Sequence, residues 1–329
     1  MMTNRQGLLL PALMLSTLVS LPTAAQEPAA NFPSRPVQIV AATSPGGPTE
    51  REVRLYIIRM SELMGQSFVL DFKPGAGNVI GTNFVAKSAP NGYTVLIVPS
   101  TFSMMAATAR NLPFDPIADF APISLMSVRS AVMVVNPSVP AKDIQEYLTY
   151  ARANPGKLNF GDSGRGGAGH MAGSWFHNLT GTKVTFVHYK GTGPSTLDLV
   201  AGRVDVAMEA LTTLMPLIKS GKVRALAIAS ERRTHALPQL QTIAEQGVPG
   251  YNYPSWLGFV VPAGTPPAIV NKLSENFALT ARTPEIVKAL EADGSFMVGN
   301  TPAQFRELIV AETERWRKVV KDADIKLEE

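Results

Sequence analysis

The sequence predicts an α/β protein built as two lobes, each with a largely parallel sheet covered by helices. Two observations carry this prediction. Short apolar runs alternate with glycine turns and with segments of helical spacing along most of the chain, an order typical of strands joined by crossover helices. The length of 329 residues also exceeds what one hydrophobic core usually serves, which favours two cores.

An export leader is predicted at the amino terminus. Arg5 is followed by an apolar run over residues 8–21 and by the small residues Thr23-Ala24-Ala25, the three-part pattern of a secretory signal peptide. The run is short for a membrane-spanning helix of about 20 residues, and it contains Pro11. The chain has no cysteine, so neither a lipid anchor at the cleavage site nor a disulfide is expected. We expect residues 1–25 to be removed and the mature protein to be periplasmic.

The first lobe is expected to open with three strands joined by two helices. Its first strand leads into the turn Pro45-Gly46-Gly47. Pro48 then stands where the first position of a helix tolerates proline, because that N–H has no partner within a helix. The predicted strands are 37–42, 67–72 and 93–98, and the predicted helices are 50–63 and roughly 77–87.

The same alternation predicts a second lobe and a return to the first. Residues 223–229 and 258–261 are late strands suited to crossing back, and Thr301 with Pro302 is a typical helix start. The other strands are expected at 130–135, 157–160, 184–187 and 204–208. The helices are expected at 142–153, 170–179, 269–281, 284–292 and 301–321, with one more that ends at residue 199.

This order predicts how the chain divides. Residues 26–129 and 257–329 are assigned to the first lobe, and residues 130–256 to the second. In open α/β sheets the ligand crevice lies at the carboxyl ends of the strands. A cleft between the two lobes is therefore the expected functional site.

Two glycine loops stand at such strand ends, one in each predicted lobe. They are residues 43–49 and residues 162–169, and each precedes a helix. Glycine allows close approach of the backbone to a ligand, and unpaired N–H groups at a helix start attract anions. A third loop, 189–194, adds hydroxyl and N–H donors. Either the loops bind an anion or they are ordinary tight turns, and the residues leave both interpretations open.

A dinucleotide site is not expected, although Gly164, Gly166 and Gly169 match G-x-G-x-x-G. That fingerprint needs an acidic residue about 20 positions further on to hold the ribose hydroxyls. Between Ser163 and Leu197 there is neither Asp nor Glu. We therefore expect no cofactor.

Nucleophilic catalysis is also not expected. Ser163, Asp205 and His235 follow the order of one hydrolase triad, but the G-x-S-x-G elbow that exposes such a serine is missing. Residues 161–164 imitate the serine neighbourhood of trypsin-like proteases, where the histidine precedes the serine, whereas the first histidine here is His170.

Neither a metal centre nor a nucleic-acid interface is predicted. The histidines lack a carboxylate at ligand spacing, so structural or capping roles are expected for His170, His177, His188 and His235. The formal net charge is +4 and falls to +3 when Arg5 leaves with the leader. With no run of Lys or Arg, this charge is not a nucleic-acid footprint.

At these loops the chain resembles the Bug (TctC-like) receptors, the extracytoplasmic solute receptors associated with tripartite tricarboxylate transporters. The resemblance spans nearly the whole mature chain and depends on the order of many short motifs. They are Pro45-Gly46-Gly47, Pro74-Gly75-Ala76-Gly77, Ile80-Gly81, Asn91-Gly92-Tyr93-Thr94, Asp119-Phe120-Ala121-Pro122-Ile123, residues 154–159, Tyr189-Lys190-Gly191, residues 202–206, residues 224–227, Trp256-x-Gly258, residues 262–266 and Glu314-Arg315-Trp316.

The resemblance implies a type II periplasmic-binding-protein fold with two doubly wound lobes around a ligand cleft. It further implies a carboxylate ligand held by main-chain and hydroxyl donors of both lobes. The implied ligand-binding residues are Thr43, Ser44, Gly46, Gly47, Thr49, Glu50, Ser100, Thr101, Ser103, Asp162, Ser163, Gly164, Arg165, Gly166, Gly167, Ala168, Tyr189, Lys190, Gly191, Thr192 and Glu209.

Five of these positions or their neighbours depart from the usual family pattern. The family usually has Asp at Glu50 and Glu209, a small hydroxyl residue at Asp162, an uncharged residue at Arg165 and Pro at His188. Arg165 is expected either to pair with a ligand carboxylate or to neutralise Asp162.

The expected function is therefore that of a monomeric receptor and not of an enzyme. The resemblance implies capture of a small organic acid for the membrane components of a tripartite tricarboxylate-type transporter. Two alternatives stay open: an orphan periplasmic sensor that feeds a signalling partner, and a hydrolase.

Overall fold

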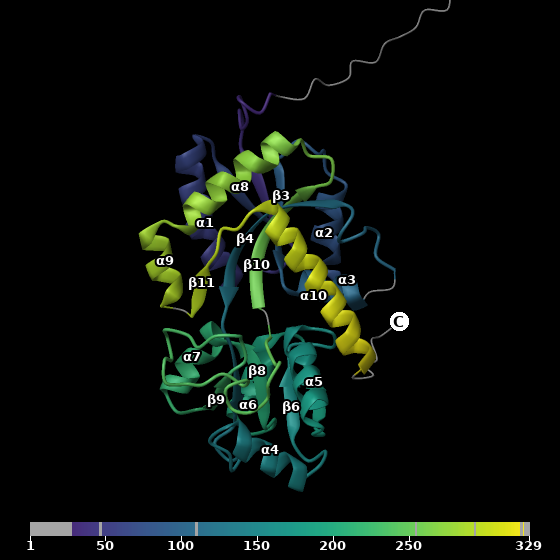
Figure 1. Ribbon diagram of the computed structural model, residues 1–329, viewed down its shortest axis with the longest axis vertical. Helices are drawn as coiled ribbons and strands as arrows, with labels where there is room; N and C mark the ends of the chain where they lie inside the picture. The colour runs from purple at the N-terminus through teal and green to yellow at the C-terminus, as the bar shows by residue number, and fades with distance from the viewer. Residues whose placement is uncertain are drawn as a thin grey trace, which may run out of the picture.

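The computed structural model describes residues 28–45, 48–108, 111–253, 255–292, 294–322 and 325. Two sheets form the centres of two lobes that lie one above the other along the long axis (Figure 1). The leader predicted at 1–25, with Gly46 and Gly47 of the first glycine loop, lies outside the described residues. Within the described chain no helix is both long enough and apolar enough to cross a membrane.

The first sheet has six strands in the order β11-β4-β10-β3-β1-β2. Strands β1, β2 and β3 are parallel, and β10 runs antiparallel between β3 and β4. The strands are β1 (Val37–Ala41), β2 (Phe68–Phe72), β3 (Thr94–Pro99), β4 (Phe120–Arg129), β10 (Ser255–Pro262) and β11 (Ser295–Met297). The helices are α1 (Pro48–Met64), the short 3-10 turn η1 (Ala76–Asn78), α2 (Val79–Ala86), α3 (Thr101–Thr108), α8 (Pro267–Ala281), α9 (Pro284–Glu291) and α10 (Pro302–Asp322).

Side-chain alternation along β1 explains why this sheet is covered on both faces. Ile39 packs with Tyr56 of α1 and Phe277 of α8 in one buried cluster. The next residue, Val40, points to the other face and packs with Phe305 of α10 in a second cluster. Successive strand residues face opposite sides of a sheet, so a strand buried on both faces is mostly apolar. The first lobe is doubly wound, as predicted.

The second sheet has five strands in the order β7-β6-β8-β5-β9, with β6 parallel to β7 and to β8. One face is covered by α4 and α5, and the other by α6 and α7. The strands are β5 (Ala131–Val135), β6 (Asn159–Asp162), β7 (Thr185–His188), β8 (Val206–Ala210) and β9 (Arg224–Ile228). The helices are α4 (Ile144–Ala153), α5 (Ala168–Thr180), α6 (Thr192–Val200) and α7 (Leu211–Lys219).

The lobes are joined by two strand crossings and one helix. Strand β4 ends at Arg129 and β5 begins at Ala131, so one extended segment passes between the lobes, and β10 re-enters the first sheet at Ser255. Helix α10 descends from the first lobe to the side of α5 (Figure 1). Its Phe305 packs in the first lobe and its Trp316 in the second. The division at 129/130 and 256/257 stays a prediction.

The two-lobed α/β architecture predicted from the sequence is confirmed, but four elements were missed. These are α3, β4, α7 and β11. Strand β4 lacks a continuous apolar run because Pro122, Ser124 and Ser127 interrupt it. Its buried serines are compensated by hydrogen bonds, from Ser124 Oγ to the Asn300 carbonyl at 2.8 Å and from Ser127 Oγ to Glu52 at 3.0 Å. Helix α7 contains Pro216, and proline usually breaks the interior of a helix.

Candidate functional site

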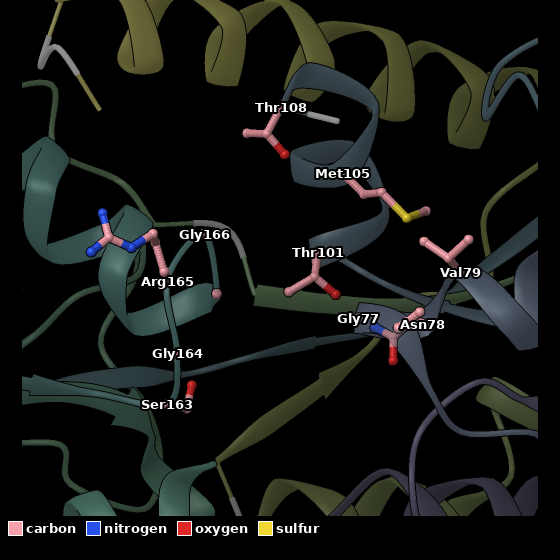
Figure 2. A pocket seen from close by; sticks show the side chains of 12 residues that line it. Gly77, Asn78, Val79, Thr101, Met105, Thr108, Ser163, Gly164, Arg165 and Gly166 are labelled. Atoms are coloured by element: carbon pink, nitrogen blue, oxygen red, sulfur yellow. The ribbon is translucent and has the colours of Figure 1, made fainter. Parts of the chain in front are cut away.

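A cavity of about 540 Å³ opens between the lobes. Its first-lobe wall is formed by residues 76–79 and by Thr101, Met105 and Thr108 on one side of α3. Its second-lobe wall is the loop 163–167 that follows β6. Figure 2 shows this loop facing α3 and residues 77–79 across the cavity. The cavity thus lies between the lobes at the carboxyl end of β6, where the strand order predicts the ligand crevice.

Among the described residues of the first glycine loop, Thr43, Ser44 and Thr49 do not line that cavity. Thr43 is half-buried and Ser44 is exposed. The hydroxyl of Thr49 accepts a hydrogen bond from Arg129 at 3.3 Å, and Glu50 forms an ion pair with Arg54 one turn along α1, at 2.5 Å. Thr43 and Ser44 follow β1, and Thr49 and Glu50 lie in the first turn of α1, near Arg129 at the end of β4.

Of the three predicted residues around the start of α3, only Thr101 lines the cavity. Ser100 is buried, and its N–H donates to the Trp256 carbonyl at 3.0 Å. Ser103 is fully buried, and its hydroxyl lies 3.4 Å from the Ile309 carbonyl of α10. The chain passes from strand to helix here, and Thr101 faces the cavity while Ser100 and Ser103 are buried. The sequence could not specify which would face the cleft.

The second glycine loop lines the cavity from Ser163 to Gly167. Three of its N–H groups already have partners within the protein. Gly164 donates to Asp162 Oδ1 at 2.8 Å, Gly166 to His170 Nδ1 at 2.9 Å and Gly167 to the Gly164 carbonyl at 3.0 Å. The prediction from the sequence was that such N–H groups are free to hold an anion. The polar side chains that this loop presents to the cavity are those of Ser163 and Arg165.

Glycine is required in this loop for conformational reasons. Gly164 has φ of 137° and Gly166 has φ of 72°, values that residues with a side chain rarely adopt. Ala168 begins α5 and packs against the core of the second lobe. The loop is therefore a shaped segment of backbone between β6 and α5, and Arg165 stands at its tip between the two unusual glycines.

Asp162 lies beneath this loop and not in the cavity wall. Its side chain is fully buried, and its Oδ2 lies 2.8 Å from His188 Nδ1. Burial raises the pKa of the Asp162 carboxyl, while the hydrogen bond from Gly164 and the nearby His188 act in the opposite direction. Asp162 and His188, two residues that depart from the usual family pattern, are thus in contact with each other.

The third loop and Glu209 form the remaining part of the predicted site. The Tyr189 hydroxyl donates to Asp198 at 2.6 Å, and Lys190 is exposed. Thr192 lies 3.5 Å from Glu209 Oε2, whereas Glu209 Oε1 has no hydrogen-bond partner among the described residues and is closed off from solvent. Burial, followed by the charge of Asp162, raises the pKa of Glu209 to about 7.

The alternative hydrolase triad is not assembled. Asp205 accepts the Asn159 N–H at 2.7 Å, at the start of β6, whereas Ser163 follows the opposite end of that strand. His235 packs against Phe296 of β11, with ring centroids 5.9 Å apart. In the part of the chain that the structure describes, no group of three or more His, Cys, Asp or Glu side chains is arranged to hold a metal ion.

Sequence reasoning missed the contribution of residues 76–79, Met105 and Thr108 to the cavity. Residues 74–77 were identified as a motif of the family resemblance but were not placed in the site, although they follow β2 of the parallel part of the sheet. Their position after a parallel strand was the signal that could have placed them in the cleft. The pairing of Asp162 with His188 could have been found in a similar way, because β6 and β7 are parallel and these residues are register partners.

A family model supports the two-lobed receptor interpretation. Residues 53–325 match the model described as "Tripartite tricarboxylate transporter family receptor". The protein BugT of Bordetella pertussis is 32% identical, over 92% of this chain and 94% of that protein. A protein encoded in the tcbD-tcbE intergenic region of Pseudomonas sp. (strain P51) is 35% identical, over 88% of this chain and 86% of that protein.

Solved structures agree over almost the whole fold. An R. palustris protein, Rpa4515, solved with adipate, is 34% identical with a TM-score of 0.81 and covers 89% of this chain and 99% of its own. MatC from Rhodopseudomonas palustris with bound malate is 29% identical with a TM-score of 0.77, covering 88% and 100%. The periplasmic binding protein BugD is 29% identical with a TM-score of 0.79, covering 90% and 100%.

These relatives are binding proteins, which confirms the expectation of a solute receptor in place of an enzyme. The described chain has the two lobes and the intervening cavity that such a receptor needs. The chain belongs to the tripartite tricarboxylate transporter receptor family, the Bug (TctC-like) solute-binding proteins.

Proposed function

We propose that this receptor captures a small organic acid in the cleft between its lobes and delivers it to the membrane components of a tripartite tricarboxylate-type transporter. The observation that carries the proposal is the cavity of about 540 Å³, which is bounded by Thr101 and Asn78 on one side and by Ser163 and Arg165 on the other. Hydroxyl, amide and guanidinium donors suit a carboxylate, and a guanidinium can pair with it through two hydrogen bonds.

The ligands of the solved relatives support this class of compound. Rpa4515 was solved with adipate and MatC with malate, both of which are dicarboxylates. The leader expected at residues 1–25 supports export to the periplasm, where a receptor for a membrane transporter must work. A monomer suffices for this role, because one chain supplies both walls of the cavity.

A ligand screen tests the proposal. Mono-, di- and aromatic carboxylates, amino acids and amides are compared by thermal shift, and compounds that raise the melting temperature are then titrated by calorimetry. We expect at least one dicarboxylate to bind. If no carboxylate stabilises the folded protein while an amide or amino acid does, the assignment to organic acids is wrong.

A matched pair of variants tests the site. Thr101→Val removes a cavity hydroxyl with little change in shape, and we expect it to weaken binding of the best acid at least threefold. Thr149→Val removes an exposed hydroxyl on α4 and should leave the affinity unchanged. Equal affinities for wild type and both variants would place the ligand elsewhere.

A further inference from the structure

The loop that carries Arg165 is held from beneath by two side chains. Asp162 Oδ1 accepts the N–H of Gly164 at 2.8 Å, and His170 Nδ1 accepts the N–H of Gly166 at 2.9 Å. Arg165 lies between these two fixed points. The backbone on both sides of the cavity-lining arginine is therefore set by acceptors that do not themselves line the cavity.

His188 joins these two acceptors into one cluster. Its Nδ1 lies 2.8 Å from Asp162 Oδ2, and its ring meets the ring of His170 edge to face, with centroids 4.7 Å apart. The His188 ring is also parallel to that of Phe186, at an interplanar angle of 8°. A carboxylate accepts hydrogen bonds, so the proton of His188 sits on Nδ1 when it pairs with Asp162.

The hydrogen bond from Gly166 also fixes the state of His170. An acceptor Nδ1 carries no proton, so the neutral ring must hold its proton on Nε2. Burial, with smaller contributions from His188 and Arg165, lowers the pKa of His170 to about 4. The ring is thus neutral around pH 7, as its role as an acceptor requires.

We propose that Asp162, His170 and His188 are positioning residues that hold the loop 163–167 in its binding conformation and so determine how Arg165 and Ser163 meet the ligand. This inference rests on the proposed function of the cavity. It removes Asp162 from the set of ligand contacts, because both of its oxygens are engaged by Gly164 and His188. It also gives Asp162 a hydrogen-bond partner in His188.

A substitution pair at His170 separates the acceptor from the ring. His170→Asn keeps an acceptor oxygen near the position of Nδ1, whereas His170→Leu fills similar space without an acceptor. We expect His170→Leu to weaken binding of adipate or malate, whichever the wild type binds, at least tenfold, and to speed amide exchange at Gly166 at least tenfold in the ligand-free protein. His170→Asn should stay within about threefold of wild type in both measurements, since a side-chain amide oxygen can accept the same hydrogen bond.

The control is another buried histidine on the same helix. His177 lies near the end of α5, where its Nδ1 is 2.7 Å from the Thr182 hydroxyl, away from the loop. His177→Leu should lower the melting temperature but leave the dissociation constant and the Gly166 exchange rate unchanged. If His177→Leu and His170→Leu weaken binding equally, only the general stability of α5 matters and the proposal is overturned.

The wild-type protein provides a test that needs no variant. Nitrogen-15 correlation spectra report which imidazole nitrogen carries the proton, and we expect the Nε2–H tautomer for His170 between pH 6 and 8. Detection of Nδ1–H would overturn the proposal, as would a His170→Leu variant with wild-type affinity and exchange. If the wild type binds no carboxylate, the proposed function fails, whereas the tautomer and the exchange rates still decide whether His170 positions the loop.

Discussion

Arg165 lines the cavity, and its role depends on where its guanidinium lies relative to the opposite wall and to Asp162. Its guanidinium extends away from Thr101 and Asn78 in Figure 2, so direct contact with a ligand requires the side chain or the lobes to move. The Asp162 carboxyl feels the charge of Arg165 and lies 2.8 Å from Nδ1 of His188. The proposed function assigns a ligand carboxylate as a further partner of the Arg165 guanidinium.

Removal of the Arg165 charge should weaken binding strongly. We expect Arg165→Gln to raise the dissociation constant of the best acid at least tenfold, equivalent to about 1.4 kcal/mol, as measured by calorimetry. Arg152→Gln removes the same charge from the exposed end of α4 and should change nothing. If Arg165→Gln combined with Asp162→Asn binds like wild type, Arg165 only balances Asp162 and does not contact the ligand.

Glu312 gives a second prediction at the scale of one residue. It is 2% exposed, pairs with Arg315 at 3.1 Å through one oxygen, and has no hydrogen-bond partner for the other oxygen among the described residues. Burial raises the pKa of Glu312 to about 7. A folded-state pKa above the unfolded value means that the protonated form is stabilised by folding. This contribution is complete below about pH 4.5 and is lost as the pH rises through 7.

Glu312→Gln should therefore stabilise the protein at high pH only. In urea unfolding at pH 8 we expect the free energy of unfolding to exceed that of wild type by about 1–2 kcal/mol, with little difference at pH 5. Glu314→Gln changes an exposed carboxyl on the same helix and should show no such dependence. A variant that is less stable than wild type at both pH values would mean that the ion pair with Arg315 outweighs the cost of burial.

At the scale of elements, the position of α10 on the first sheet depends on a missing side chain. A Cβ built at Gly258 of β10 would collide with the ring of Phe305. Phe305 is fully buried and packs edge to face on Trp256, with centroids 5.5 Å apart. The helix can approach the strand this closely only because position 258 has no side chain.

Gly258→Ala should consequently destabilise the fold by about 1–3 kcal/mol, the usual cost of overpacking a core. Chemical denaturation measures this loss, and a double-mutant cycle with Phe305→Leu should show that part of it is recovered. Gly193→Ala, at a helical position with open space around the added carbon, is the matched control and should be neutral or slightly stabilising. Strict additivity of Gly258→Ala and Phe305→Leu would exclude the collision as the cause.

Elements with a strong local signal could be predicted, and those specified by tertiary contacts could not. Strands β1, β3 and β5 are mostly apolar because nearly all of their residues are buried. Strand β4 is equally central, but its serines hydrogen-bond to Asn300 and Glu52, far away in the sequence. For the site, the loop 163–167 was identified from its glycines. The partners of its N–H groups, above all His170 and Asp162, depend on distances that only the folded loop shows.

At the scale of the whole molecule, ligand capture should close the lobes. Each lobe supplies one wall of the cavity, so a ligand that contacts both walls favours the closed arrangement of the lobes. A ligand at a hundredfold excess over its dissociation constant stabilises the folded state by about 2.7 kcal/mol. We expect the best acid to raise the melting temperature and to reduce the radius of gyration in small-angle scattering. A non-binding compound from the same screen is the control, and tight binding with an unaltered scattering profile would contradict closure.

Trp316 of α10 has a consequence for the order in which the protein acquires its structure during synthesis. Its indole is fully buried in the second lobe, against Trp175 and Tyr253, yet it leaves the ribosome after almost all of the printed sequence. The second core therefore lacks one of its largest side chains until synthesis has passed residue 316. A nascent chain with an unfinished core holds stable structure poorly, so stable folding of the second lobe should follow the synthesis of α10.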